Sequence, residues 1–517
     1  MFLPEGSSSP TRCQAVSLRE EEVPMASRAL PTIALGAVTL LAGCSAFRSY
    51  DNELQETNQQ LRAGNIDAAL TLLEKHNQGE DKDLLYYFEK GELLRSKGDL
   101  NGSQAAWGHA DQVVGTWEDS VKLDTDKYLA QFGSFLINDK VRRYEGYDYE
   151  KVMLTTQMAM NLLANNDFDG ARMAIKKTHE REAVIAELRD KEYLKREDEA
   201  EKQGIKTQYK DLQGYPVEAL DAPDVVNLKN SYQSAFSHYL SGFVYEALGE
   251  KDLAAPGYRK AAELRPNTPL LEQALLNLDA PVEVPQVQAP AKSRHKSAAK
   301  TPAKAPAIAA LAADESDVLI VVQSGLAPAR DSVRIPLPIP IRDKLVITPL
   351  SFPVIKADNS TQAFAQIGID GQQQELTLLN STTAMSRRAL RDDMPGIILR
   401  TTVRAVSRGV AQKNLNEVNP LASLAVGLAS AVTEGADTRT WRTLPDYTQV
   451  TRLRLKQGEH KLSLPNALGG TQVQVKVDQR YQVIALRVVG NQVFSSGLAA
   501  QVIPNHVGQN MASNQRP

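Results

Sequence analysis

A period of 34 residues in the N-terminal half is the feature that most restricts the possible fold. Expected turns at Gly64, Gly98 and Asn166 are separated by 34 residues and then by 68, which is twice 34. The next expected turn, at Gly249, follows after two more periods and about 15 inserted residues. Each turn lies between apolar segments with helical spacing, so the pattern predicts a stack of helix pairs that bury each other's apolar faces.

The clearest repeat runs from His238 to Pro266 and resembles a tetratricopeptide repeat, a second copy of which lies upstream. Small residues would let two helices approach closely, aromatic residues would fill the space beside them, a glycine would form the turn, and a proline would end the second helix. The residues expected to pack the repeats are Gly91, Gly98, Trp107, Gly242, Tyr245, Gly249, Ala254, Tyr258 and Pro266. We therefore expect a tetratricopeptide α-solenoid over residues 44–282.

The N-terminal segment carries an export signal. Residues 25–43 contain a short basic region with Arg28 and an apolar stretch from Leu30 to Leu41, too short to span a bilayer, which needs roughly 20 residues. The stretch ends in Leu-Ala-Gly followed by Cys44, a sequence that resembles a bacterial lipobox and predicts lipidation of Cys44. Because residues 1–24 are acidic, which is unfavourable before a signal peptide, we interpret them as a misannotated leader. Alternatively, Cys44 is an ordinary buried thiol.

Charge and composition divide the remaining chain. Residues 44–282 carry a net charge of -12, whereas residues 316–517 carry +8, which predicts two domains that attract one another or have different partners. Between them, residues 283–315 are rich in proline, alanine and lysine, as in a flexible linker, which could also contact an anionic envelope polymer. Residues 316–505 predict a β-rich domain with a helical insertion at 386–435, and residues 506–517 a disordered tail. The expected fold class is therefore multidomain α plus β.

Within the β-rich region, Val318–Val322 and Tyr481–Val489 are apolar runs typical of buried strands. The segment Val333–Ile341 contains three prolines and is expected at an edge or in a loop. In the helical insertion, Arg400, Arg404 and Arg408 are spaced four apart, which places them on one helix face. This face could bind an anionic partner, dock onto the acidic repeats or remain solvated.

The segment Leu421–Val432 is apolar but too short to cross a bilayer, so we expect it to pack against the sheet or a helix, with membrane insertion as the alternative. In the segment Ala436–Pro445, we expect Trp441 to pack in the core while Asp437 and Arg439 stabilise a turn; the alternative is a ligand-contacting loop.

The lipobox, the repeats, the strand VLIVVQSGLAP and the segment ADTRTWRTLP together resemble a poorly characterised family of tetratricopeptide-repeat lipoproteins of Gram-negative bacteria. The resemblance implies an architecture and brings no assigned activity. Ser45 after the cysteine implies an outer-membrane location facing the periplasm, by similarity to enterobacterial sorting.

No catalytic pattern accompanies this architecture. The seven histidines lack metal-ligand spacing, and phosphate-loop, dinucleotide-binding and serine-hydrolase motifs are absent, so no enzyme, cofactor or metal is expected. A formal net charge of -3 does not indicate a nucleic-acid-binding surface. We expect an adaptor whose repeats bind an envelope protein; the alternatives are a module that binds peptidoglycan or anionic polysaccharide, and a hydrolase with an unrecognised site.

Overall fold

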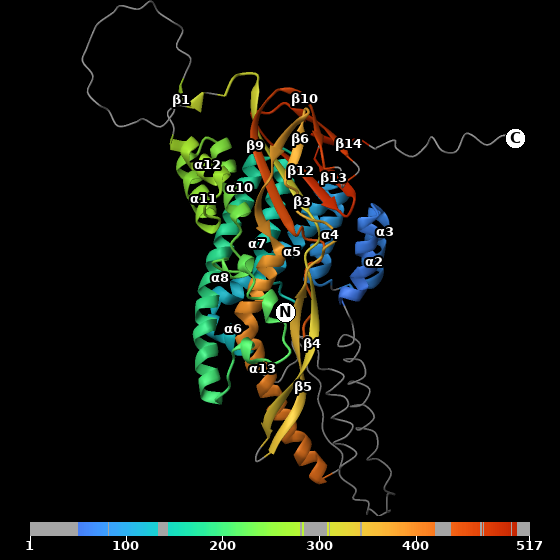
Figure 1. Ribbon diagram of the computed structural model, residues 1–517, viewed down its shortest axis with the longest axis vertical. Helices are drawn as coiled ribbons and strands as arrows, with labels where there is room; N and C mark the ends of the chain where they lie inside the picture. Colours follow the sequence, from blue (N-terminus) through green and yellow to red (C-terminus); the bar gives the residue numbers. More distant parts are fainter. Residues whose placement is uncertain are drawn as a thin grey trace, which may run out of the picture. The chain divides into compact units, whose positions relative to one another are not determined.

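The computed structural model describes residues 50–80, 82–132, 143–279, 282–283, 308–309, 311–341, 344–418, 436–465, 468, 470–497 and 499–503. Helices occupy the N-terminal part of these residues and strands most of the C-terminal part, where one long helix interrupts the strands (Figure 1). The chain is therefore a mixed α/β protein whose layout agrees with the expected order of elements.

Helix pairs form on either side of the expected turns. The pairs are α2 (Tyr50–Arg62) with α3 (Ile66–His76), α4 (Leu84–Lys97) with α5 (Leu100–Leu123), α7 (Asp148–Ala164) with α8 (Phe168–Gln203), and α10 (Ala235–Ala247) with α11 (Lys251–Leu264). Shorter elements join or follow them: α6 (Thr125–Phe132), the 3₁₀ helices η2 (Tyr209–Asp211) and η3 (Val217–Ala219), α9 (Pro223–Val226) and α12 (Pro269–Asp279).

Left-handed backbone conformations reverse the chain within these pairs. The φ angles are +83° at Gly64, +88° at Gly98, +79° at Gly249 and +60° at Asn166. Glycine adopts this conformation without steric cost, and asparagine is among the few other residues that tolerate it. The predicted turn positions are therefore confirmed.

The close helix approach predicted at two glycines is also present. A Cβ atom added to Gly91 would lie 2.2 Å from Trp107 Nε1, and one added to Gly242 would lie 2.4 Å from Tyr258 Cδ1. Trp107 and Tyr258 are fully buried, so each ring fills the space that the missing side chain leaves. Of the other expected packing residues, Ala254 is buried, Tyr245 is partly buried against the same core, and Pro266 follows the end of α11.

Two five-stranded sheets form the C-terminal region. The first has the order β13-β12-β3-β9-β8, in which only β12 and β3 pair in parallel; the second, β14-β11-β10-β6-β7, is antiparallel. The strands are β3 (Glu315–Ser324), β6 (Gln366–Ile369), β7 (Gln372–Glu375), β8 (Thr377–Ser381), β9 (Tyr447–Lys456), β10 (Gly458–Ser463), β11 (Gln472–Val477), β12 (Tyr481–Val489), β13 (Gln492–Ser496) and β14 (Ala500–Ile503).

The first sheet is the middle of three layers. From β3, Val318, Ile320 and Val322 pack toward the second sheet, whereas Leu319 and Val321 belong to a core with helices α10 and α11. Both faces of the strand are therefore buried, which explains its continuous apolar sequence.

A separate hairpin of β4 (Ala329–Ile341) and β5 (Lys344–Lys356) pairs in one continuous antiparallel register. As expected from its prolines, β4 has no partner other than β5 among the described strands. The long helix α13 (Thr382–Val418) packs along this hairpin (Figure 1). It confirms the helical insertion over residues 386–418, and the rest of the insertion, including Leu421–Val432, lies outside the described residues.

The hydrophobic core crosses the boundary between the two domains expected from the sequence. One buried cluster joins Phe88 and Trp107 of the helices to Trp441 and Leu444 of the C-terminal region. All the residues that the structure describes accordingly belong to one compact unit. Helices and sheet are packed onto each other, and the interface between them is internal.

The predicted leader, signal peptide, Cys44 and C-terminal tail lie outside the described residues. Of the predicted linker, residues 283, 308–309 and 311–315 are described. The strand β2 (Ile308–Ala309) pairs with β1 (Val282–Glu283), which straddles the start of the linker. Among the described helices, none combines the length and the apolar character needed to cross a membrane.

Candidate functional site

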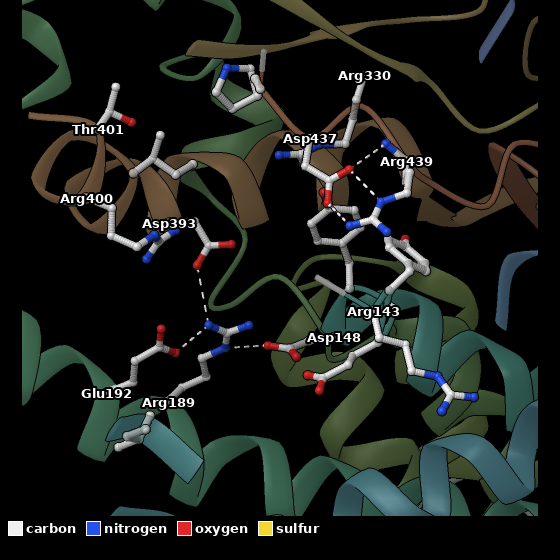
Figure 2. A pocket seen from close by; sticks show the side chains of 18 of the residues that line it. Arg143, Asp148, Arg189, Glu192, Arg330, Asp393, Arg400, Thr401, Asp437 and Arg439 are labelled. Atoms are coloured by element: carbon white, nitrogen blue, oxygen red, sulfur yellow. Dashed lines mark hydrogen bonds and ion pairs between the residues drawn. The ribbon is translucent and has the colours of Figure 1, made fainter. Parts of the chain in front are cut away.

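A pocket of about 300 Å³ lies among helices α7, α8 and α13, the β4–β5 hairpin and the loop that precedes β9 (Figure 2). Its wall is rich in charge, with eight arginine and lysine side chains against five carboxylates. The basic residues are Arg143, Lys151, Arg189, Arg330, Arg400, Arg404, Arg408 and Arg439, and the acidic residues are Glu145, Asp148, Glu192, Asp393 and Asp437.

One guanidinium organises the carboxylates on the helix side of the pocket. Arg189 of α8 donates from Nε to Asp148 Oδ2 at 2.5 Å and from Nη1 to Glu192 Oε2 at 2.5 Å, and it lies 3.4 Å from Asp393 Oδ1 (Figure 2). Lys151 adds a contact to Asp148 at 3.4 Å. Burial alone would raise the pKa of the Asp148 carboxyl, but Arg189 and Lys151 outweigh it and lower that pKa.

The loop before β9 contributes another carboxylate whose charge is paired with an arginine. Arg439 donates to Asp437 Oδ1 at 2.9 Å and to Oδ2 at 2.7 Å, and its backbone N–H donates to Asp437 Oδ1 at 3.0 Å, so the two residues interact locally as expected, although no regular turn forms there. Trp441 is fully buried and stacks on Phe88 with ring centroids 4.5 Å apart, so the expectation that it packs is also confirmed. Because Asp437 and Arg439 line the pocket, the same loop could also contact a ligand.

Arg330, near the start of β4, is the unusual cation of the site. The residue is only 4% exposed, and its Nε and Nη1 atoms are buried without a hydrogen-bond partner. Its guanidinium carbon lies 4.3 Å from the centre of the Tyr147 ring, a cation–π contact. In Figure 2 it lies beside Asp437 and Arg439, whose charges are already joined to each other.

The three arginines predicted as one helix face, Arg400, Arg404 and Arg408, all line this pocket from α13. Arg400 approaches α8, where it joins Arg189 and Arg196 in lowering the pKa of Glu192 against the opposing effect of burial. Gly396 makes room for this approach, since a Cβ atom there would lie 2.8 Å from Arg196 Cδ and 3.1 Å from Arg400 Nη1. The face is therefore in contact with the acidic helices at one end and lines the pocket along its length.

The remaining wall offers hydroxyl groups and apolar surface. Burial raises the pKa of the Tyr147 hydroxyl well above its usual value, so the group stays neutral. Thr401 and Ile397 of α13 face the pocket together with Leu188 of α8. Fixed cations beside neutral donors suit the binding of an oxyanion, because guanidinium groups pair with carboxylate or phosphate through charge-assisted hydrogen bonds.

Two histidines that are distant in the sequence meet elsewhere in the helical region. The rings of His179 and His238 stack with centroids 5.1 Å apart, and His238 Nε2 lies 3.0 Å from Glu182 Oε2. Among the residues that the structure describes, however, no group of three or more potential ligands could hold a metal ion.

Sequence patterns identified only part of this site. The α13 arginines were found through their spacing, whereas Arg189, Arg330 and Lys151 belong to elements far apart in the chain. Arg330 in particular begins a strand without any periodic signal. Comparison with known proteins adds nothing to this assignment, because no family model and no curated protein matches the chain.

Proposed function

We propose that this chain is a lipid-anchored protein of the Gram-negative outer membrane, facing the periplasm, that binds an anionic partner at the arginine-lined pocket without catalysis. The proposed location rests on the lipobox at Cys44 and on Ser45, which follows it. The binding role rests mainly on one observation. Arg400, Arg404 and Arg408 line the same pocket as the buried guanidinium of Arg330, while Arg189 and Arg439 neutralise carboxylates of its wall.

We interpret the helix pairs as tetratricopeptide repeats, and the adaptor role predicted from them remains a proposal. Such repeats often bind an extended segment of another chain. Here buried carboxylates of α4 and α7 already bind an irregular segment of this chain: Glu150 accepts from the backbone N–H of Trp441 at 2.7 Å, and Glu89 from that of Arg442 at 2.7 Å. Because that helical surface is occupied internally, we expect the external partner at the pocket.

The favoured partner is an anionic envelope polymer, peptidoglycan or polysaccharide. A fixed set of cations matches closely spaced carboxylates or phosphates on such a polymer. A hydrolase is less supported, because arginines lower the pKa values of the Asp148 and Glu192 carboxyls against the effect of burial, which favours the ionised form and opposes a role as proton donor.

The binding role is tested by reversing the charge of the α13 face. The variant Arg400→Glu, Arg404→Glu, Arg408→Glu should keep the fold but lose most co-sedimentation with purified sacculi. The loss should be largest at low salt, because exposed charges more than about 8–10 Å apart are screened at physiological ionic strength. The matched control is Lys456→Glu, Lys461→Glu, Lys476→Glu, the same charge change at three exposed lysines of the sheets.

Equal binding by wild type and the α13 variant would exclude these arginines from polymer binding. Equal losses in both variants would indicate that net charge alone matters. If sacculi do not bind but an acidic envelope protein is captured in a pull-down through the same arginines, the adaptor role is supported instead.

The proposed outer-membrane location is tested by a separate experiment. Labelled palmitate should enter the protein in cells, and Cys44→Ala should abolish both the labelling and retention in the outer-membrane fraction. A Cys44→Ala protein that still floats with outer-membrane vesicles would show that the cysteine is not the anchor.

A further inference from the structure

Burial disfavours the charge of Arg330, and although neighbouring groups that include Asp437 and Asp393 favour it, neither of these carboxylates forms an ion pair with it. Three of the carboxylates around the pocket have other partners: Asp437 binds Arg439, Asp393 is shared by Arg189 and Arg196, and Asp148 binds Arg189 and Lys151. No ion pair joins Arg330 to a carboxylate of the described residues, and two of its three nitrogens lack acceptors. A buried charge without a partner is strongly unfavourable, and each unsatisfied donor adds to the cost.

The contact with Tyr147 replaces only part of the lost hydration. A ring face attracts the guanidinium but accepts none of its N–H groups in the plane, where arginine donates. A ligand that accepts from these N–H groups is one explanation for such a group, and its position in a pocket favours that explanation.

We propose that Arg330 is the specificity-determining residue of an oxyanion subsite, at which the pocket takes up the carboxylate or phosphate group of a small molecule or of a polymer end. The inference rests on the proposed function because it uses the same pocket. It adds to that function the chemical group that is bound, an oxyanion, and the residue that recognises it, Arg330.

The pocket favours this chemistry in size and in charge. A volume of about 300 Å³ is at the lower end for small-molecule sites and accommodates one sugar or amino-acid unit with its anionic group. The cations from α13 that line the same pocket would hold further negative charge, so a ligand with more than one anionic group should bind more tightly than a monoanion. A planar arginine fork distinguishes oxyanions from spherical halides.

The test measures thermal unfolding of the full chain with inorganic phosphate, acetate or chloride at equal ionic strength. Phosphate should raise the Tm of the wild type more than acetate, and both more than chloride, because a ligand that binds only the folded state stabilises it. Arg330→Met should abolish the site-specific part of the phosphate-dependent rise and retain only the general stabilisation that phosphate gives to folded proteins. The matched control is Arg334→Met, an exposed arginine on the same strand, which should retain the full rise.

The ligand-free protein provides a second readout that a merely structural arginine would not give. If Arg330 serves a ligand, Arg330→Met removes a buried charge that has no ion-pair partner and two unsatisfied donors, and the Tm without ligand should stay the same or increase. If Arg330 only supports the fold through Tyr147, that Tm should fall, and this result would overturn the proposal.

A variant that keeps the charge tests the planar geometry of Arg330 separately from its charge. Arg330→Lys retains a cation over Tyr147 but loses the planar fork, so its phosphate affinity measured by calorimetry should fall at least tenfold. Unchanged affinity in Arg330→Lys, or a wild type that responds equally to phosphate and chloride, would refute the subsite.

Failure of this inference and of the proposed function can be told apart. If the α13 variant loses polymer binding but the phosphate response does not depend on Arg330, the proposed function is supported and the subsite is refuted. If the phosphate response depends on Arg330 but neither a polymer nor a protein binds, the pocket is a small-anion site and the polymer-binding function is refuted.

Discussion

Two buried glutamates connect the helical region to the segment before β9. Glu89 accepts hydrogen bonds from the backbone N–H groups of Arg442 and Thr443, at 2.7 and 3.0 Å, and from the Thr443 hydroxyl at 2.5 Å. Glu150 accepts from the N–H of Trp441 at 2.7 Å and from the Thr440 hydroxyl at 2.9 Å. Each carboxylate satisfies backbone donors of an irregular segment that would otherwise be buried without acceptors.

Burial of Glu89 makes the stability depend on pH near neutrality. Burial raises the pKa of the Glu89 carboxyl from 4.5 to about 7, although the surrounding hydrogen bonds oppose the rise. The folded chain therefore holds this proton more tightly than the unfolded chain. The stability that it contributes is complete below about pH 4.5 and is lost as the pH rises through about 7.

We expect the contribution of Glu89 to make the Tm fall between about pH 4.5 and 7, and the fall to be smaller in Glu89→Gln. The amide should also lower the free energy of unfolding at every pH by about 2–3 kcal/mol, because its NH₂ group faces donors. Asp446, whose pKa burial raises to about 6, contributes with the same sign and remains in the variant. The matched control is the exposed Glu187→Gln. A wild-type pH slope in Glu89→Gln would assign the dependence to another group.

At the level of elements, the sequence predicts what depends on short-range stereochemistry. The turns at Gly64, Gly98 and Gly249 need a left-handed backbone, so their residue type reveals them. The α13 arginines were likewise found because helix geometry fixes side chains four residues apart. The roles of Glu89 and Glu150 were hidden, since a glutamate in a helix is usually solvated and only the packing of a distant segment buries it.

The packing of α10 against α11 gives a sharp prediction about one glycine. In Gly242→Ala the new methyl group would overlap the buried ring of Tyr258, which cannot swing away, so the free energy of unfolding should fall by about 1–3 kcal/mol. Gly115→Ala is the control, because nothing lies within 4 Å of its added Cβ atom in α5.

Alanine favours helix over glycine, so the control should gain about 0.5–1 kcal/mol. Chemical denaturation of both variants measures whether the free energy of unfolding falls in Gly242→Ala and rises in Gly115→Ala. Stabilisation of both would mean that α10 and α11 are further apart than described.

For the molecule as a whole, the charge asymmetry between the two halves was visible in the sequence, but its structural role was not. Some of that charge is paired across the interface inside the protein: Arg487 of β12 donates to Glu92 of α4 at 2.7 Å, with both side chains fully buried. Arg452 of β9 joins Glu246 of α10 at 2.8 Å and Asp317 of β3 at 2.7 Å. Periodicity within each half cannot reveal such contacts, because they depend on how two distant regions pack.

The shared core leads to the last prediction, which separates apolar packing from simple charge attraction. Residues 50–283 produced alone should be helical but should aggregate, because the surfaces that contact β3 and Trp441 would be exposed. Produced together with residues 308–503 as a second chain, they should co-purify as a one-to-one complex. The complex should persist at about 1 M salt, where the Debye length is only about 3 Å, because apolar contacts and buried ion pairs are screened little. Size-exclusion chromatography at low and high salt measures this. Separation of the two chains at high salt would show that net charge holds the halves together, and a monomeric, cooperatively unfolding 50–283 would restore the two independent domains that the sequence suggested.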